Sequence, residues 1–303
     1  MGTDYGVPVD VMPITLCIST RNAEADLAGC IESARPWVSE VVVVDMESDD
    51  ATLAIAREKG AKIVQVPAAG WAEPGRQAGL EAATQPWMLV LDADERAGPR
   101  LAEVVSSYVG RDDVDGVWLP RQNFQFGMWL EKSGIWPDWQ LRLFRPELTT
   151  WPSHRTHVGA QVRGRVEHAP AETSNAILHH SFPSISAWVG SMNSYTALEA
   201  QRLAEAGRKP GIGRLLAVPL ARFAELYIAK RGYRSGRYGL TIALLSLCYW
   251  LLAELKLWEL SLKPDSPPRG SVREPAKVTI WARTLNRLNV GADGPSSSEP
   301  DAR

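Results

Sequence analysis

The sequence predicts an α/β domain, built on a sheet with a parallel core and helices on both faces, followed by a helical extension. Over residues 13–110, short apolar runs alternate with helix-like stretches, which is typical of βαβ units. From residue 184 onward, long helix-like stretches replace this alternation. The chain has 303 residues, of which 45% are hydrophobic, and this is enough for a full core with an appendage.

The first half supplies four predicted strands and the helices between them. The strands are Ile14–Ser19, Glu40–Asp45, Lys62–Val66 and Trp87–Leu91. The helices are Ala23–Ala34, Ala51–Lys59 and Gly75–Ala83. The β-branched run EVVVVD is typical of a strand buried on both faces. We expect Glu24 and Asp26 in the first turn of their helix, where carboxylates suit the helix dipole, and Gly60 as a C-cap.

The second half changes character after Arg111. Val117–Leu119 and Leu141–Phe144 are predicted strands, separated by a loop rich in Trp, Phe and Gly. Three helices are then predicted, at Trp188–Ala206, Ile212–Lys230 and Tyr238–Leu260. We therefore expect a catalytic domain over 13–183 with halves 13–110 and 111–183, a helical extension over 184–262, and a partly disordered tail over 263–303.

Composition and cysteine usage narrow the class of protein. A net charge of −2 argues against nucleic-acid binding by the chain as a whole. Cys17, Cys30 and Cys248 are scattered without metal-type spacing, which indicates reduced thiols in a cytosolic protein. The segment MGTDYGVPVDVMP has no basic region followed by an apolar run, so we expect no secretion signal and a cytoplasmic catalytic part.

Carboxylates follow the fourth predicted strand directly, in the run LDADE. In open parallel sheets, ligands bind beyond the carboxyl ends of the strands. Asp92, Asp94 and Glu95 would repel one another unless a cation or hydrogen-bond donors neutralise them. A hard divalent ion fits, because it takes oxygen ligands and shares them with substrate phosphates. The alternative is an acidic loop that caps the next helix.

Polar side chains also follow the first two predicted strands. Asp45 ends the second strand, where it could accept hydrogen bonds from a base or ribose; a turn or N-cap role within MESDD is the alternative. Thr20 and Asn22 follow the first strand in the run STRN. Three strand ends with polar groups at one sheet edge favour a binding site there.

An ordered series of segments resembles glycosyltransferase family 2, which has a GT-A fold. The segments are ITLCISTRNAEADLAGCIES, EVVVVDMESDDAT, GRQAGLEAA, WMLVLDADE, WLPRQNFQFG, SGIWPDWQLRLFRP, ILHHS and YIAKRGYRSGRYGL. The pattern is most similar to the lipopolysaccharide core β-glucosyltransferase subgroup. The resemblance covers roughly Pro13 to Trp258, most of the chain.

The resemblance implies an inverting transfer of a sugar, glucose or a related hexose, from a UDP-sugar to a hydroxyl of a glycan or lipid-linked glycan. On the donor side, Asp92 belongs to the acidic motif that binds donor and metal. Asp45 matches the acid that contacts uracil and ribose. Thr20 and Asn22 line the nucleotide pocket, and Arg76 contacts either the diphosphate or the acidic loop.

For the chemistry, the resemblance implies that Asp94 and Asp92 bind a divalent ion, Mn²⁺ or Mg²⁺. Asp138 matches the later acidic motif, whose aspartate is the general base; a turn or helix cap is its alternative, since Trp-Pro precedes it. His179 is expected to be a metal ligand or phosphate contact, with a hydrogen-bonded structural histidine as the alternative.

Three positions depart from the family pattern. The turn after Asp45 is MESDDA where the family prefers small residues and Gly. The family's His-Glu pair is His157-Val158, and Gln77 stands where members usually have Asn. Because Val158 replaces the glutamate of the His-Glu pair, a functional role for His157 is weakened.

The helical extension suggests contact with a membrane. Gly239–Ala253 is uncharged for fifteen residues, short of the ~20 that span a bilayer, so a buried or interfacial helix is favoured. Within Ile212–Lys230, apolar residues form a stripe, and the neighbouring segment is basic. The basic residues are Arg208, Lys209, Arg214, Arg222, Lys230, Arg231, Arg234 and Arg237. This favours an anionic membrane surface. Packing on the catalytic domain, a dimer interface and binding of acidic sugar acceptors are the alternatives.

Other functional classes fit less well. A sugar nucleotidylyltransferase needs a Gly-rich basic loop after the first strand, and STRNAEADL has no glycine. An aspartyl phosphatase carries its Asp-x-Asp after the first strand, whereas DAD follows the fourth. A non-catalytic membrane-surface protein that retains the fold is a further alternative.

Overall fold

The computed structural model describes residues 10–68, 73–129, 131, 136–152 and 159–262. The chain forms two compact units, Met1–Leu260 and Ser261–Arg303. The account below concerns the first unit. His157 and the predicted tail over 263–303 lie outside the described residues.

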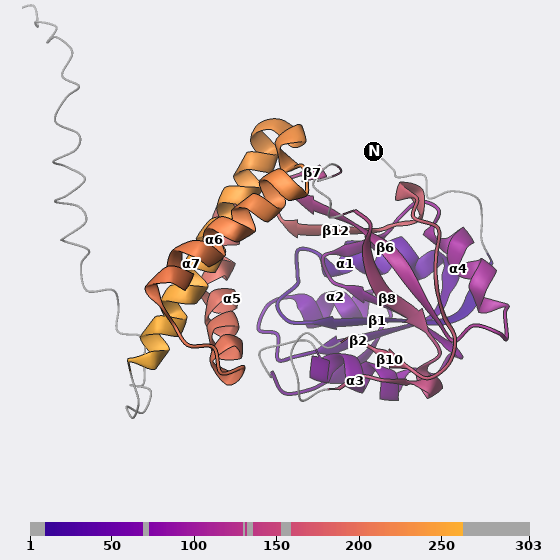
Figure 1. The fold of residues 1–303 in the computed structure, drawn as a ribbon. Coiled ribbons are helices and arrows are strands. Elements are labelled where there is room, and N and C mark those ends of the chain that lie inside the picture. Colours follow the sequence, from indigo (N-terminus) through magenta and orange to yellow (C-terminus); the bar gives the residue numbers. More distant parts are fainter. Residues whose placement is uncertain (1–9, 69–72, 130, 132–135, 153–158, 263–303) are drawn as a thin grey trace, which may run out of the picture. The chain divides into compact units, whose positions relative to one another are not determined.

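The first half of the chain contains a parallel sheet, as predicted. Its strands lie in the order β3, β2, β1, β4 and pair in parallel. β1 and β2 lie next to each other in Figure 1. Their bounds are β1 Met12–Thr20, β2 Val38–Asp45, β3 Lys62–Gln65 and β4 Trp87–Asp92. The register pairs Thr20 with Asp45 and Ser19 with Asp92. The polar residues at the strand ends therefore meet at one edge, as parallel pairing requires.

Beyond β4 the sheet becomes mixed. β8 (Asp138–Phe144) runs antiparallel to β4, and β6 (Gly116–Gln125) antiparallel to β8. β12 (Ile177–Phe182) pairs in parallel with β6 and antiparallel with the short β5 (Glu95–Ala97). Two short strands also pair with β6, namely β7 (Met128–Trp129) and β11 (Val166–His168). A separate ribbon joins β9 (Thr149–Thr150) and β10 (Gln161–Val162).

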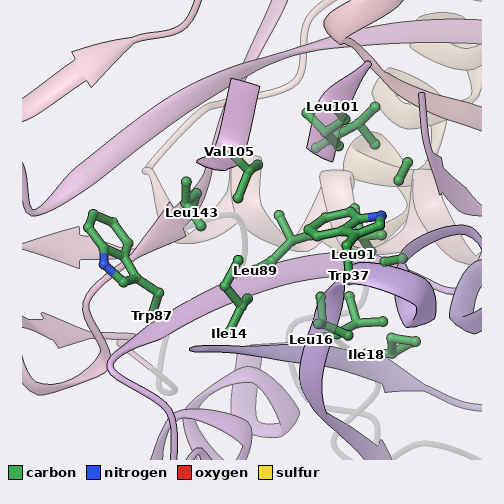
Figure 2. Close-up of a cluster of buried hydrophobic side chains, with 14 of the residues drawn as sticks. Ile14, Leu16, Ile18, Trp37, Trp87, Leu89, Leu91, Leu101, Val105 and Leu143 are labelled. Atoms are coloured by element: carbon green, nitrogen blue, oxygen red, sulfur yellow. The ribbon is translucent and has the colours of Figure 1, made fainter. Parts of the chain in front are cut away.

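Helices cover both faces of the sheet, as predicted. α1 (Leu27–Ala34), α2 (Thr52–Glu58) and α4 (Leu101–Val109) pack on one face, and α3 (Glu73–Ala82) on the other. The pleat of β1 divides its side chains between the two cores: Ile14, Leu16 and Ile18 join the first, shown in Figure 2, and Cys17 joins the second. Short 3₁₀ turns lie at Arg35–Trp37, Pro146–Leu148 and Thr173–Asn175.

The predicted helix over Ala23–Ala34 was wrong at its start, because α1 begins only at Leu27 and has no acidic residue in its first turn. The carboxylate of Glu24 instead accepts a hydrogen bond from Ala51 N at 3.0 Å. Ala51 follows the neighbouring strand β2, and the periodicity of apolar residues in a helix cannot reveal such a distant partner. Helix α4 was not predicted. Gly60 follows Lys59, the C-cap residue of α2, with φ +67°, the left-handed position in which glycine commonly closes a helix.

The extension is helical, as predicted. α5 spans Ile185–Glu205, and α6 (Ile212–Ala224) continues as one π-helical turn at Glu225–Ala229. A 3₁₀ turn at Gly232–Ser235 leads into α7 (Gly236–Ser261). A Cβ on Gly239 would lie 1.9 Å from the Gly232 carbonyl oxygen, so only glycine permits this close crossing. The glycines of GYRSGRYGL thus build the turn between α6 and α7.

Two kinds of contact hold α7. Its Tyr238 hydroxyl donates toward the carbonyl oxygens of Gln125 (2.6 Å) and Met128 (2.8 Å) in the β6–β7 hairpin. Arg214 of α6 pairs at 2.7 Å with Glu254, whose side chain is buried. Within the described residues, Gly232–Ser261 is the one helical stretch long and apolar enough to cross a membrane, and 28% of its most apolar window is buried. Length and composition alone are weak evidence for a span.

Candidate active site

Reciprocal hydrogen bonds join the loops after β1 and β2. Asn22 N donates to Ser48 Oγ, and Asp49 N donates to Asn22 Oδ1, both at 2.9 Å. Asn22 adopts φ +52°, a conformation that asparagine tolerates better than most residues. Glu24 N also donates to Asp50 Oδ2 at 3.0 Å. The polar MESDDA turn, a departure from the family pattern, therefore holds the first loop in place.

Thr20 and Asp45 lie beneath these loops and are largely or wholly buried. Thr20 is 4% exposed and Asp45 0%. Asp45 Oδ2 accepts a hydrogen bond from Ser48 N at 3.3 Å. Among the described residues, Asp45 Oδ1 has no hydrogen-bond partner, nor has the nearby Ser19 Oγ. Asp45 is therefore closed off from solvent in this structure, and the Met46–Asp50 turn is bonded to it through Ser48.

Asp92 is held by two arginines. Its carboxylate accepts from Arg76 Nη2 and from Arg142 Nη2, both at 2.6 Å. Of the two contacts expected for Arg76, the structure has the one with the acidic loop. Burial alone would raise the pKa of Asp92, but attraction to Arg142 and Arg76 outweighs it and lowers the pKa well below the usual range. Asp92 is therefore a carboxylate at all ordinary pH values.

Glu95 continues the same network and is completely buried. Its Oε1 accepts from Arg121 Nη1 at 3.0 Å and from Arg142 Nη2 at 3.2 Å. Its Oε2 accepts from Asp92 N at 2.9 Å, which closes the DADE turn. Repulsion among the carboxylates, anticipated from the sequence, is thus relieved at Asp92 and Glu95 by guanidinium groups.

Asp138 is the first residue of β8, and three side chains hold it. Arg121 donates to Oδ2 through Nε at 2.8 Å and lies at 2.7 Å through Nη2. Asn123 donates to the same oxygen and Gln140 to Oδ1, each at 2.9 Å. Burial opposes ionisation, yet Arg121, Asn123 and Gln140 together lower the pKa of Asp138. The expected base is therefore ionised at neutral pH.

His179 joins Asp138 to Asp94. Its Nδ1 lies 2.6 Å from Asn123 Oδ1, and its Nε2 lies 3.3 Å from Asp94 Oδ2. One connected network thus runs from Arg76 through Asp92, Arg142, Glu95, Arg121, Asp138, Asn123 and His179 to Asp94. It contains four carboxylates and three guanidinium groups. The structure therefore brings Arg76, Asp92, Asp94, Asp138 and His179 together.

The sequence analysis did not predict a role in the site for four members of this network: Glu95 as a structural acid, Arg121, Asn123 and Arg142. The spacing of the polar residues on β6 and β8 was a signal that could have indicated such a role. Arg121 and Asn123 alternate on β6, and Asp138, Gln140 and Arg142 alternate on β8, so each set lies on one face of its strand. Only the register, which pairs Arg121 with Asp138 and His179 with Asn123, shows that the two sets meet.

Asp94 and His179 form the donor set that best fits a metal. The Asp94 side chain is 35% exposed, and its Oδ2 lies 3.3 Å from His179 Nε2. Two neighbouring ligands on an octahedral ion with bonds of ~2.1 Å lie about 3 Å apart. Within the part of the chain that the structure describes, no group of three or more His, Cys, Asp or Glu residues could hold a metal. Substrate phosphates would have to supply the remaining ligands.

A cavity of about 340 Å³ adjoins this pair. Its lining comes from the DAD turn, β12, α5 and α7. The residues are Asp94, His179, Ser181, Phe182, Trp188, Met192, Tyr195 and Tyr249. The cavity therefore has a polar end at Asp94 and His179 and an aromatic remainder.

Comparison with known proteins identifies the family. The model of glycosyl transferase family 2 matches residues 15–164, which include the loops after β1 and β2, the acidic turn after β4 and Asp138. The chain belongs to this family. The lipopolysaccharide core biosynthesis glycosyltransferase LpsC of Rhizobium meliloti is 28% identical over 82% of this chain and 93% of its own length. The uncharacterized glycosyltransferase RT0209 of Rickettsia typhi is 28% identical over 82% of this chain and 88% of its own.

A solved structure confirms the GT-A fold of this glycosyltransferase. The mannosyltransferase PcManGT from Pyrobaculum calidifontis, in complex with GDP-Man and Mn²⁺, superposes with a TM-score of 0.50. It is 15% identical, and the match covers 83% of this chain and 88% of that one. Family membership decides for a glycosyltransferase and against the nucleotidylyltransferase, phosphatase and non-catalytic alternatives.

The ion pairs of Asp92 predict a pH dependence of stability. A carboxyl whose pKa is lowered in the folded state stabilises the protein above the ordinary value of ~3.9, and this contribution is lost as pH falls further. Urea unfolding between pH 3.5 and 7 should show that Asp92→Asn costs about 2 kcal/mol at pH 7 and flattens the slope below pH 5. The exposed Asp112 provides the control, and Asp112→Asn should leave the slope unchanged. Parallel slopes for wild type and Asp92→Asn would contradict the assigned ion pairs.

Proposed function

We propose that this glycosyltransferase moves a hexose, glucose or a close relative, from a UDP-sugar to a hydroxyl of a glycan or lipid-linked glycan, with inversion. The observation that carries the proposal is the network from Arg76 to Asp94 at the carboxyl edge of the sheet. The similarity to LpsC, named for lipopolysaccharide core biosynthesis, supports a glycan acceptor. The GDP-Man and Mn²⁺ bound by PcManGT support a nucleotide-sugar donor and a metal.

For the donor, we assign the nucleoside to the edge formed by Thr20, Asn22 and Asp45. Asp45 Oδ1, which has no hydrogen-bond partner among the described residues, provides an acceptor group there once the Met46–Asp50 turn shifts. Arg76 begins at this edge and reaches Asp92, so its guanidinium can face a diphosphate. Asp92 then orients Arg76 and contributes to donor binding through it.

For the metal, we assign Mn²⁺ or Mg²⁺ to Asp94 and His179. When bound with the diphosphate, such an ion supplies neutralising charge for the leaving group. Asp92 was expected to share this ion, but its oxygens already accept two short hydrogen bonds from arginines. We therefore place Asp92 beside the metal site as a support of Arg76 and Arg142.

For the base, we assign Asp138. Its carboxylate takes the proton from the acceptor hydroxyl as the hydroxyl oxygen bonds to the anomeric carbon. The bond from that carbon to the diphosphate oxygen breaks on the opposite face, and the electron pair leaves with UDP. Asn123 and Gln140 hold the carboxylate in place, and Arg121 keeps it ionised before the proton transfer.

For the location, we propose the cytoplasm, at the inner face of the cytoplasmic membrane. Residues 184–262 contain ten Lys and Arg against five Glu, a net charge of +5. Among the described residues, no carboxylate pairs with Arg208, Lys209, Arg231, Arg234 or Arg237. These cations flank both ends of α6, where anionic lipid headgroups would attract them.

The outer face of α6 offers the apolar contact for a membrane. Ile212, Leu216 and Leu220 recur every four residues and are 84%, 60% and 58% exposed, and Ile228 in the following turn is 63% exposed. We call these four residues the α6 stripe. Arg214 and Arg222 lie away from it, because they contact Glu254 and Trp250 of α7. An apolar row flanked by unpaired cations suits an anionic bilayer surface.

Metal-dependent nucleotide binding tests the donor site. Calorimetric titration of the full-length protein with UDP should show binding with Mn²⁺ and much weaker binding without it. Asp94→Ala should reduce affinity at least about tenfold by removing one of two protein ligands. Asp112→Ala, a change of an exposed aspartate, should bind like the wild type. Equal binding by Asp94→Ala and wild type would overturn the metal assignment.

Turnover tests the base. Asp138→Asn keeps the size of the side chain but cannot accept the proton, so transfer to the natural acceptor should fall by about 100-fold or more. UDP binding and the thermal midpoint should stay close to wild type, since Asn can keep part of the hydrogen bonding. Near-normal turnover in a folded Asp138→Asn protein would refute the role of Asp138.

Vesicle flotation tests membrane contact. The protein should float with vesicles that contain phosphatidylglycerol and much less with pure phosphatidylcholine, and added salt should weaken the binding. Leu216→Ser with Leu220→Ser should reduce partitioning about tenfold or more. Val11→Ser alters a similarly exposed apolar residue just before β1 and serves as control. A dimer that the double variant dissociates, without lipid binding, would assign the stripe to self-association instead.

A further inference from the structure

The cavity beside Asp94 is formed jointly by the catalytic domain and the extension. β12 carries His179 and Ser181 on one face and leads through two residues into α5. Ser184 caps α5 by accepting a hydrogen bond from Ala187 N at 3.1 Å, which fixes the start of the helix relative to the strand. β12 therefore carries the polar residues of the cavity and also sets the position of α5, which supplies most of its aromatic wall.

That wall follows helical spacing. Trp188, Met192 and Tyr195 of α5 stand at i, i+4 and i+7, so they line one face of the helix. Further along α5, Ala200 and Leu203 pack on Leu257 of α7. The two helices thus pack together toward the end of α5, and residues nearer its start line the cavity.

Tyr249 of α7 completes the wall and is fixed by its neighbours. Its hydroxyl lies 3.4 Å from the Tyr195 carbonyl oxygen, and burial raises the pKa of its phenol. Closer to the C-terminal end of α7, Lys256 donates a hydrogen bond to the side chain of Asn193 in α5 at 2.9 Å. The cavity is consequently a preformed site, because its walls are held by contacts outside it.

We infer that this cavity binds a neutral sugar ring of the acceptor, an assignment that rests on the proposed function. Its volume of about 340 Å³ is at the lower end of the range for small-ligand sites, which suits one or two rings. Trp and Tyr rings present flat apolar faces to the C–H face of a pyranose, and their polar atoms remain available to hydroxyls. Asp94, His179 and Ser181 supply hydrogen-bonding groups at the end nearest the metal site.

The charge of the lining selects the kind of sugar. The end of the cavity at Asp94 and His179 is the one assigned to the metal. The other described lining residues include no acidic or basic side chain; they are Ser181, Phe182, Trp188, Met192, Tyr195 and Tyr249. A phosphorylated or acidic ring seated against this wall would bring its charge to a surface that offers no opposite charge, at a cost that a neutral ring avoids. The basic residues around α6 therefore do not extend into this site, and the alternative of an acidic sugar acceptor is not favoured here.

The location suits transfer. His179 lies on the cavity wall, and Asn123 bridges it to Asp138 through contacts of 2.6 and 2.9 Å. A sugar seated against α5 and α7 therefore lies beside the proposed metal site, and His179 and Asn123 connect its site to the proposed base. None of the described residues of 122–139 is among those that line this cavity, although Asn123 holds His179 in place.

Ligand-observed NMR on the full-length protein tests the assignment. In the presence of UDP and Mg²⁺, saturation transfer is measured to methyl glucoside, methyl galactoside and methyl mannoside, and to glucose 6-phosphate and methyl glucuronide. At least one neutral glycoside should receive saturation and the two anionic probes should not. Replacement of Mg²⁺ by Mn²⁺ should broaden the signals of the bound glycoside, because the paramagnetic ion would lie beside it.

Paired variants locate the binding. Tyr195 and Tyr233 are both 52% exposed, and Tyr233 lies outside the cavity. Tyr195→Ala should weaken glycoside binding about three- to tenfold, and Tyr233→Ala should leave it unchanged. UDP binding, measured by calorimetry, should be the same in all three proteins.

The outcomes separate the two proposals. If the wild-type protein does not bind UDP, the proposed function is overturned, whether or not the glycosides bind. Intact UDP binding with no neutral glycoside bound, equal binding of the anionic probes, or no effect of Tyr195→Ala overturns the cavity assignment and leaves the donor chemistry standing.

Discussion

The arrangement of the site depends on the buried pairing of Arg142 with Asp92 and Glu95. Arg142 is 4% exposed and Glu95 is completely buried, so neither charge has water to solvate it. A buried charge that loses its partner is strongly destabilising, and the partners must therefore stay together whenever the sheet is formed. Because Arg142 lies on β8, Asp92 ends β4 and Glu95 begins β5, this pairing joins three strands that are separate in sequence. Arg121 of β6 extends the same constraint to a fourth strand.

This constraint divides the acids at the sheet edge into two groups. Asp92 and Glu95 are neutralised by arginines, and the Asp50 carboxylate accepts hydrogen bonds from the backbone amides of Glu24 and Thr52. Asp94, which is 35% exposed, has no arginine partner among the described residues, and it forms the second group with Asp138, which is 24% exposed and pairs with Arg121. The first group gives the site a fixed shape, and the second group can meet substrate. A cluster of carboxylates can therefore persist without a metal, which would then bind to a site that is already shaped.

The extension does more than cover the catalytic domain. Contacts from Tyr238 to the β6–β7 hairpin and from α5 to β12 bring aromatic residues to the Asp94 pair. The same helices expose the α6 stripe and five cations that pair with no carboxylate among the described residues, namely Arg208, Lys209, Arg231, Arg234 and Arg237. One helical unit thus presents an aromatic wall inward and an amphipathic surface outward. This division would suit an enzyme that draws a lipid-linked glycan from a membrane into its site.

The sequence by itself determined the parallel core, the helices on both faces and the helical extension, because hydrophobic periodicity is local and survives without knowledge of partners. It also placed Asp45, Asp92 and Asp94 at one edge, since parallel strands end together. The resemblance, and not periodicity, singled out Arg76, Asp138 and His179. Tertiary structure alone decided that Asp92 is paired with Arg142 and Arg76, that Asp45 is buried, and that Asn123 links His179 to Asp138. These facts depend on strand register and on partners 15 to 56 residues away, and local patterns contain no information about which distant side chains will meet.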